Sequence, residues 1–184
     1  MDSYFSAESN AAYENMRAYM NAVKGLFINQ YLSKRRVLDL GIGRGQDINK
    51  YTHAGVTSVQ GIDLDVHALQ ELVYRRLDFA KTGKRFCPLQ LALADLGAAD
   101  LKRLKELSQG VNAVCTFFSF HYYHQNRALY EMLSELPRGA VFIVSVVCKE
   151  YLLKLLGENT AFKSEHYQYR LRDNRLTIKL PFAS

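Results

Sequence analysis

The sequence contains little cysteine, little proline and no tryptophan. Its 184 residues include three Cys, three Pro and no Trp. Cys87, Cys115 and Cys148 are widely spaced and belong to no Cys-x-x-Cys motif or Cys/His cluster, which argues against both a zinc site and a disulfide scaffold. So few cysteines are typical of a protein from the reducing interior of the cell. We therefore expect an intracellular protein with no bound metal.

The sequence also lacks a long hydrophobic run. Its longest apolar stretch, residues 140–148, is broken by Ser145 and is far shorter than a membrane span. Residues 1–10 contain no basic segment leading into an apolar run, so we expect neither a signal peptide nor membrane attachment. Hydrophobic residues make up 48% and charged residues 23%, which is an ordinary globular composition. The length predicts a single domain spanning residues 1–184.

Positive charge exceeds negative charge. Lys and Arg number 24 against 18 Asp and Glu, which gives a formal net charge of +6. An excess of this sign favours an anionic partner such as a nucleic acid or a nucleotide phosphate. The 12 Tyr and 10 Phe rings can fill a core or stack on nucleic-acid bases, and composition leaves that choice open.

Hydrophobic periodicity predicts five strands that alternate with helices. Helices are expected at residues 11–32, 47–53, 66–80, 101–107 and 125–136. Strands are expected at residues 37–41, 57–63, 86–93, 111–118 and 140–147. This alternation indicates an α/β protein with a doubly wound, mostly parallel sheet, preceded by an N-terminal helix. Beyond it, a short helix is expected at residues 151–156, and an antiparallel hairpin at residues 166–172 and 175–180, joined by the turn signal Asp173-Asn174.

A glycine loop follows the first predicted strand. Gly41, Gly43 and Gly45 have the spacing GxGxG, and Gln46 stands where a dinucleotide fingerprint has its third glycine. Asp39 ends the strand two residues before the first glycine. A carboxylate there would repel a pyrophosphate, but it suits the ammonium group of S-adenosylmethionine (AdoMet). The loop therefore favours AdoMet over a nicotinamide dinucleotide.

Two further acids follow the next two predicted strands. Asp63 ends the second strand, where a carboxylate can grip a ribose diol, and Asp95 follows the third, where it can accept from an adenine amino group. With Asp39, they would line one edge of a parallel sheet. The alternative is that Asp63 and Asp95 only cap helices or turns, as Asp often does at such junctions.

Three segments resemble those of a known enzyme family. Residues 16–24 (MRAYMNAVK) are similar to a helix with the pattern Arg-x-aromatic-Asn-Asn-x-x-Lys, residues 37–47 (VLDLGIGRGQD) to VLDLGCGKGGD, and residues 118–122 (FSFHY) to FxxHYSF. The chain thus resembles the class I AdoMet-dependent methyltransferases, which have a Rossmann-like fold, and within them the mRNA cap guanine-N7 methyltransferases. The first and third segments are specific to that family, and the second is generic to the superfamily.

The resemblance implies a function and a set of site residues. The function is transfer of a methyl group from AdoMet to N7 of the guanine cap of mRNA (GpppN), with S-adenosyl-L-homocysteine as the second product and capped RNA as the partner. The implied AdoMet contacts are Lys24, Gly41, Asp63, Asp95, Leu96 and Tyr122, in addition to Asp39. The implied cap contacts are Asn21, Arg44, Lys50, Arg75, Phe118 and His121.

The chemistry of this reaction needs no general base and no metal, because guanine N7 already carries an in-plane lone pair and the AdoMet sulfonium is a reactive methyl donor. The enzyme has to align N7, methyl carbon and sulfur, and orientation can contribute up to ~7–11 kcal/mol in the best intramolecular cases. His121 and Tyr122 are therefore expected to position the reactants. Arg44, Lys50 and Arg75 would supply positive charge for the cap triphosphate. The alternatives are a core histidine for His121 and a solvated helix face for Arg75.

The chain departs from the family pattern at several positions. Met20 replaces the first Asn of the family's pair, Ala22 replaces a Trp, and Phe117 replaces a Gln that touches AdoMet. The family's later segment, a PE-[FY]-LVY-like motif whose Glu recognises guanine, has no counterpart, since Glu158 and Glu165 lie in other contexts. We therefore expect a domain that lacks the family's C-terminal elements. It would be part of a larger, viral-type capping enzyme, or its guanine pocket would be completed by another domain or subunit.

Three other functions stay open at this point. The chain could be another AdoMet-dependent methyltransferase, acting on a small molecule or a protein. It could be a non-catalytic methyltransferase-fold module that binds AdoMet or RNA, or stabilises a catalytic partner. A NAD-linked dehydrogenase is disfavoured by Asp39. Family members work in the nucleus and at cytoplasmic sites of viral assembly, so the resemblance leaves the compartment open within the cell.

Overall fold

The structure is a computed structural model that describes residues 11–83, 86–146, 154, 161–163, 168–172 and 175–179. The chain divides into two compact units. One consists of Met20–Val146, and the other of Met1–Tyr19 together with Val147–Ser184. The first unit contains every predicted site residue. The expectation of a single domain over residues 1–184 stays a prediction.

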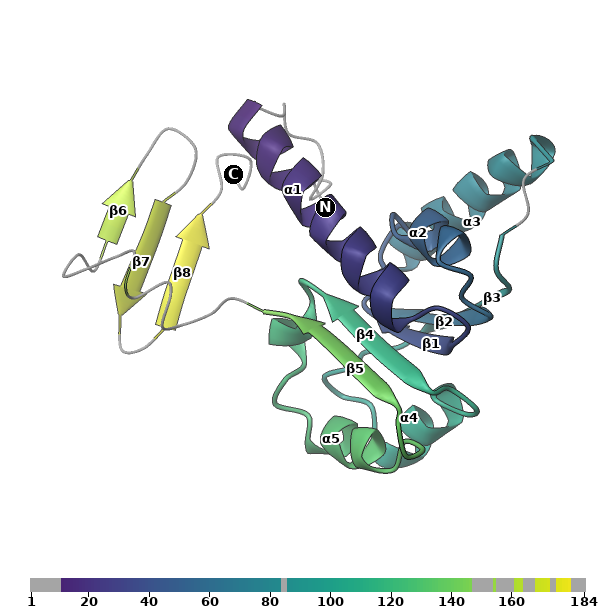
Figure 1. Ribbon diagram of the computed structural model, residues 1–184. Coiled ribbons are helices and arrows are strands. Elements are labelled where there is room, and N and C mark those ends of the chain that lie inside the picture. Colours follow the sequence, from purple (N-terminus) through teal and green to yellow (C-terminus); the bar gives the residue numbers. More distant parts are fainter. Residues whose placement is uncertain are drawn as a thin grey trace. The chain divides into compact units, whose positions relative to one another are not determined.

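Five parallel strands form the sheet of the larger unit (Figure 1). They are β1 Arg36–Leu40, β2 Ser58–Asp63, β3 Leu89–Leu93, β4 Ala113–Phe117 and β5 Val141–Ser145, in the order β3-β2-β1-β4-β5. The chain winds outward from β1 to β3 and then returns to the other side of β1, where Val37 lies opposite Ala113 of β4. Winding thus reverses between β1 and β4, and ligands bind at the carboxyl ends of strands at such a point. This topology confirms the doubly wound parallel sheet.

Helices cover both faces of this sheet. They are α1 Ala11–Tyr31, of which the residues from Met20 on belong to this unit, α2 Ile48–His53, α3 Val66–Lys81, α4 Leu101–Leu107 and α5 Arg127–Ser134. Buried side chains of α1 to α3, including Tyr51, form one core cluster with Val37 of β1. Those of α4 and α5, including Leu104, form a second cluster with Leu38. Because successive side chains of a strand point to opposite faces, Val37 and Leu38 contribute to different clusters.

The predicted elements differ from the observed ones mainly at their ends, for local reasons. β3 begins at Leu89 and not at residue 86, because Pro88 has no backbone N–H to donate to a ladder. α5 begins at Arg127 and not at residue 125, because Asn126 precedes it as a cap and its Oδ1 accepts a 3.0 Å hydrogen bond from Ala128 N.

The smaller unit contains an antiparallel sheet of β6 Ala161–Lys163, β7 Gln168–Arg172 and β8 Arg175–Lys179. Arg172 lies opposite Arg175, which confirms the predicted hairpin. β6 was not predicted, because a strand of three residues is too short to show an alternating pattern. The helix predicted at residues 151–156 falls outside the described residues except for Lys154, which is helical. Within the described ranges, no helix is long and apolar enough to cross a membrane.

Candidate functional site

A glycine loop follows β1 at the point where the winding of the sheet reverses. Gly41, Gly43 and Gly45 have φ values of +83°, +54° and +67°, in a region that residues with side chains rarely adopt. A Cβ atom at Gly41 would also overlap the side chain of Ser119, whereas at Gly43 it would meet open space. The loop is therefore closely packed at its start and leaves room for a ligand at its middle glycine.

Two hydroxyl groups tie the start of this loop to the segment after β4. Ser119 Oγ and Tyr123 Oη each donate a 2.8 Å hydrogen bond to the carbonyl oxygen of Leu40. Burial raises the pKa of Tyr123 to about 12, so its hydroxyl keeps its proton at neutral pH. Neither residue was predictable from the sequence, because these contacts join positions 79 and 83 residues apart and leave no local signal.

Asp39 is a buried carboxylate of β1, with 4% of its surface exposed. Tyr51 of α2 donates a 2.7 Å hydrogen bond to its Oδ2 and lies 3.1 Å from Cys115 Sγ. Burial raises the pKa of the Asp39 carboxyl to about 7, against the lowering effects of the Tyr51 hydrogen bond and the charge of Lys24. A cation bound close to this carboxyl would therefore favour its charged form at neutral pH.

Asp63, at the end of β2, also holds the glycine loop. Its Oδ2 accepts a 2.7 Å hydrogen bond from Gly43 N, and its Oδ1 accepts a 2.9 Å bond from Asp65 N. The second bond is a turn contact, as the alternative interpretation of this residue requires. Because a carboxylate oxygen offers two lone pairs, the half-buried Asp63 can still accept from the hydroxyls of a ribose.

Asp95 and Leu96 follow β3. Asp95 is exposed, and its Oδ1 accepts a 2.8 Å turn hydrogen bond from Gly97 N. Leu96 is buried in the second core cluster, so only its backbone can face a ligand. Because β3, β2 and β1 are neighbours, Asp95, Asp63 and Asp39 lie in a row along the carboxyl edge of the sheet. This is the arrangement that the sequence predicted.

Three predicted site residues meet around an acid that the sequence analysis did not single out. Asp47 pairs with Lys24 Nζ at 2.7 Å and with Lys50 Nζ at 2.6 Å. Lys50 Nζ also donates a 3.3 Å hydrogen bond to Asn21 Oδ1. One carboxylate thus holds two ammonium groups, and the cluster carries a net positive charge. Asp47 closes the glycine-loop segment, and that position was the signal by which it could have been found.

Two more predicted cap contacts share a second acid. Arg44 Nε of the glycine loop lies 2.9 Å from Glu71 Oε2, and Arg75 pairs with Glu71 Oε1 from one turn further along α3. This pairing positions both guanidinium groups and again leaves one positive charge in excess. A solvated helix face remains an open interpretation of Arg75, since 44% of its side chain is exposed.

The end of β4 presents an aromatic ring in a strained backbone conformation. Phe118 has a φ of +63° and is 44% exposed, and such outliers are typical of functional sites. With Phe117 it lines a cavity of about 300 Å³ between α1 and β5. Lys24 Nζ also lines this cavity, 5.6 Å and 5.9 Å from the two ring centres. Phe117 packs against the first core cluster, as a mainly structural residue would.

His121 and Tyr122 lie in a short 3-10 helix, η1 Phe120–Tyr122, directly after that strand. Both side chains are exposed, and their ring centres are 3.9 Å apart. The exposure of His121 excludes the alternative of a core histidine. Among the described residues, no three His, Cys, Asp or Glu side chains are grouped as a metal site requires.

A match to a protein-family model shows which family the chain belongs to. A family model described as the mRNA (guanine-N(7))-methyltransferase domain matches residues 6–179. The chain belongs to this family. The resemblance to the guanine-N7 methyltransferases is thereby confirmed over most of the chain.

Individual relatives agree with this assignment. The mRNA-capping enzyme of African swine fever virus (strain Badajoz 1971 Vero-adapted) is 31% identical over 183 residues, covering 91% of this chain and 21% of that protein. The mRNA cap guanine-N(7) methyltransferase of Cryptococcus neoformans (strain JEC21) is 28% identical over 156 residues, covering 78% of this chain and 24% of that protein. The chain spans about a fifth to a quarter of the length of these relatives.

Solved structures show the fold. Magnesium protoporphyrin IX methyltransferase from Synechocystis PCC 6803, determined with bound AdoMet, has a TM-score of 0.51 and 16% identity. The alignment covers 95% of this chain and 84% of that one. The chain therefore has the Rossmann-like fold of AdoMet-dependent methyltransferases.

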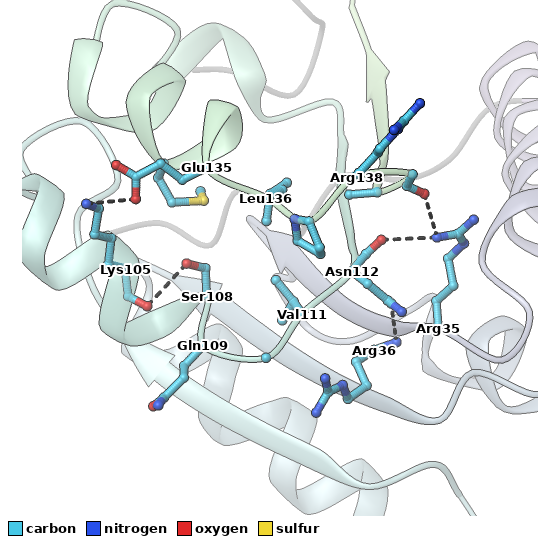
Figure 2. Close-up of a pocket in the computed structure, with 15 residues that line it drawn as sticks. Arg35, Arg36, Lys105, Ser108, Gln109, Val111, Asn112, Glu135, Leu136 and Arg138 are labelled. Carbon is cyan, nitrogen blue, oxygen red and sulfur yellow. Dashed lines mark hydrogen bonds and ion pairs between the residues drawn. The ribbon is translucent and has the colours of Figure 1, made fainter.

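A larger cavity, of about 560 Å³, lies at the opposite, amino-terminal edge of the sheet (Figure 2). Two of its cations, Arg35 and Lys105, are engaged in structural contacts. Arg35 Nη1 donates to the carbonyl oxygens of Asn112 and Gly139 at 3.2 Å and 3.1 Å, and Lys105 pairs with Glu135 at 2.7 Å. Arg35 thus connects the loops that lead into β4 and β5. The carboxyl edge, with its glycine loop and row of acids, is therefore the better candidate for the functional site.

Proposed function

We propose that this chain transfers a methyl group from AdoMet to N7 of the guanine cap of mRNA. The single observation that carries the proposal is the row formed by Asp39, Asp63 and Asp95 beside the glycine loop, in a chain of the guanine-N7 family. Acids in a row repel pyrophosphate, but they suit a ligand that carries an ammonium group, a ribose and an adenine. The supporting neighbour with bound AdoMet shares this fold.

The residues present fit AdoMet. Gly43 leaves open space above the loop, and Asp63 keeps acceptor capacity for a ribose diol. Burial raises the pKa of the Asp39 carboxyl to about 7, so a neighbouring cation would favour its charged form. Asp95 and the Leu96 backbone would bind the adenine, and Gly41, Lys24 and Tyr122 would complete the cofactor contacts.

The cap would bind where the positive charge is in excess. Lys50 and Arg44 lie next to the glycine loop, and Arg75 lies on α3, so the three can meet the oxygens of a triphosphate. The cavity beside Phe118 has room for a guanine ring, which can stack there. Asn21 and His121 offer directional hydrogen bonds to the ribose or the base.

Positioning is the task of these residues. The cofactor supplies a methyl group on a positively charged sulfur, and guanine N7 supplies the electron pair, so no residue has to move a proton. Lys24, His121 and Tyr122 surround the place where the two ligands meet, and Phe117 and Phe118 exclude water from it. Fixing both ligands in line is worth several kcal/mol in such a reaction.

The partners follow from the relatives. Capped RNA is the proposed substrate. Because one relative is an mRNA-capping enzyme, we expect the chain to work with the other domains or subunits of such an enzyme. Location in the nucleus or at a cytoplasmic assembly site stays a prediction. A non-catalytic module is the second candidate, because Met20 and Phe117 stand where the family has polar contacts.

The deciding experiment is AdoMet binding by calorimetry, followed in the same sample by methyl transfer to a GpppA-capped RNA. Binding with transfer to guanine N7 is the expected result. Binding without transfer would favour the non-catalytic module or a missing partner, to be settled by adding the longer chain. A folded protein that binds no AdoMet would overturn the roles of Asp39, Asp63 and Asp95. Triphosphate-ended RNA without a cap is the matched control substrate.

A further inference from the structure

A small cavity between the glycine loop and α3 has no role in the function proposed above. Its volume is about 150 Å³, well below the ~300–1,000 Å³ of cavities that enclose drug-sized ligands. It therefore has room for a single ring system. Its wall includes Gln46 and Asn49 near the start of α2, Arg76 and Phe79 of α3, and Phe86.

The wall of this cavity combines aromatic rings with a guanidinium group. The ring centres of Phe79 and Phe86 are 5.5 Å apart, and Arg76 Cζ lies 6.0 Å from the centre of the Phe86 ring. Aromatic rings and guanidinium planes are the surfaces on which proteins stack the bases of single-stranded RNA. Gln46 and Asn49 add amide groups that can pair with the edge of a base.

Arg76 carries an unused hydrogen-bond donor at this place. Its Nη1 is buried, and no acceptor for it is found in the part of the chain that the structure describes. Buried donors of this kind are rare and call for an explanation, such as a ligand that supplies the missing acceptor.

The position of the cavity links it to the proposed cap site. Arg44 and Arg75 line it as well, and they are two of the three cations proposed for the cap triphosphate. In capped RNA, the triphosphate joins the guanosine to the first transcribed nucleotide. A triphosphate held by Arg44 and Arg75 therefore delivers that nucleotide to the mouth of this cavity.

We propose that the cavity beside Arg76 and Phe79 binds the base of the first transcribed nucleotide of the capped RNA. The base stacks on the Phe79 ring and the Arg76 guanidinium and accepts a hydrogen bond from Arg76 Nη1. This inference rests on the proposed function and names part of its substrate. It makes the enzyme selective for a capped end over free GTP, which has the same guanosine triphosphate but no second base.

The first test compares methyl transfer to GpppA with methyl transfer to GTP. In Arg76→Gln and Phe79→Leu, we expect the ratio of kcat/KM for GpppA to kcat/KM for GTP to fall about tenfold, because one stacked base is lost. The control Arg103→Gln, at a half-exposed side chain of α4, should keep the wild-type ratio. An unchanged ratio in both cavity variants overturns the proposal. Thermal melting checks that each variant is folded. If Arg76→Gln does not fold, Phe79→Leu alone tests the proposal.

The second test does not depend on activity. A GpppN dinucleotide with 2-aminopurine as its second base reports stacking through its fluorescence. We expect quenching on binding to the wild-type chain and its loss in Phe79→Leu. Quenching without methyl transfer would contradict the proposed function and retain the base site. Methyl transfer without quenching would retain the function and overturn the base site.

Discussion

The hydroxyl of Tyr51 donates a 2.7 Å hydrogen bond to the buried carboxyl of Asp39. The two side chains come from α2 and β1 and lie on opposite sides of the glycine loop in the sequence. The bond favours the charged form of a carboxyl that burial would otherwise neutralise. Tyr51 thereby sets how much negative charge Asp39 presents to a cationic ligand at neutral pH.

Replacing Tyr51 by Phe should weaken AdoMet binding in a pH-dependent way. The hydrogen bond lowers the pKa of Asp39, so its loss raises that pKa further above about 7. At pH 7 more of the carboxyl is then protonated, and calorimetry should show a Kd several-fold higher than in the wild type. As the pH rises, the ratio of the variant's Kd to the wild-type Kd should fall towards one, because deprotonation of the AdoMet ammonium group affects both proteins alike. Tyr74→Phe, at an exposed position of α3, is the control and should bind like the wild type.

The raised pKa of Asp39 also predicts how stability depends on pH. The folded-state pKa, about 7, lies above the ordinary value of 3.8, so the folded state binds the proton more tightly. This contribution to stability is fully present below pH 3.8 and is lost as the pH rises through about 7. Asp39→Asn lacks the titration and keeps an acceptor for Tyr51. Burial also raises the pKa values of Tyr51 and Cys115, so both groups stay protonated in this range.

Urea unfolding at pH 5 and pH 8 measures this effect. From pH 5 to pH 8, the free energy of unfolding of the wild type should fall by a few kcal/mol relative to that of Asp39→Asn. One pKa unit corresponds to about 1.4 kcal/mol. A difference between the two proteins that is the same at both pH values would show that Asp39 has an ordinary pKa.

Periodicity was sufficient to predict the sheet, because buried parallel strands and amphipathic helices leave regular patterns. The row of acids was predictable for the same reason, since Asp39, Asp63 and Asp95 each lie at or close to the end of a strand. The groups that hold the site together were not predictable from the sequence. Asp47 pairs with Lys24 of α1, Glu71 pairs with Arg44 of the glycine loop, and Ser119 reaches Leu40 across 79 residues. Only the folded chain brings such partners together.

Replacing Gly41 by Ala should destabilise the fold and abolish AdoMet binding. The added Cβ overlaps the side chain of Ser119, and the φ of +83° disfavours any side chain. A cost of about 1–2 kcal/mol for the left-handed conformation alone is expected, and urea unfolding would measure it. Gly25→Ala is the matched control, because its Cβ meets nothing within 4 Å and Ala in a helix is favoured over Gly by about 1 kcal/mol. A Gly41→Ala protein as stable as the wild type would exclude the close packing described for the loop.

Replacing Lys50 by Ala should weaken binding of capped RNA without affecting AdoMet. Lys50 is one of the cations proposed for the triphosphate, and each phosphate contact to a single strand contributes about 0.7 to the slope of log K against log salt concentration. Fluorescence titrations from low to high salt should show that loss and a higher Kd at low salt. Lys105→Ala, which removes a cation at the other edge of the sheet, should keep the wild-type slope. Equal slopes in all three proteins would remove Lys50 from the cap site.

Replacing Phe118 by Gly should separate stability from function. Gly adopts the φ of +63° freely, so relief of strain should offset the loss of a ring that is already 44% exposed. Urea unfolding should therefore give a free energy within about 1 kcal/mol of the wild type. The KM for capped RNA should nevertheless rise about tenfold, because the stacking surface for guanine is gone. Phe118→Ala keeps the strain and loses the ring, so it should be the less stable of the two variants with the same KM. A KM that matches the wild type in both would show that Phe118 supports the cavity without touching the cap.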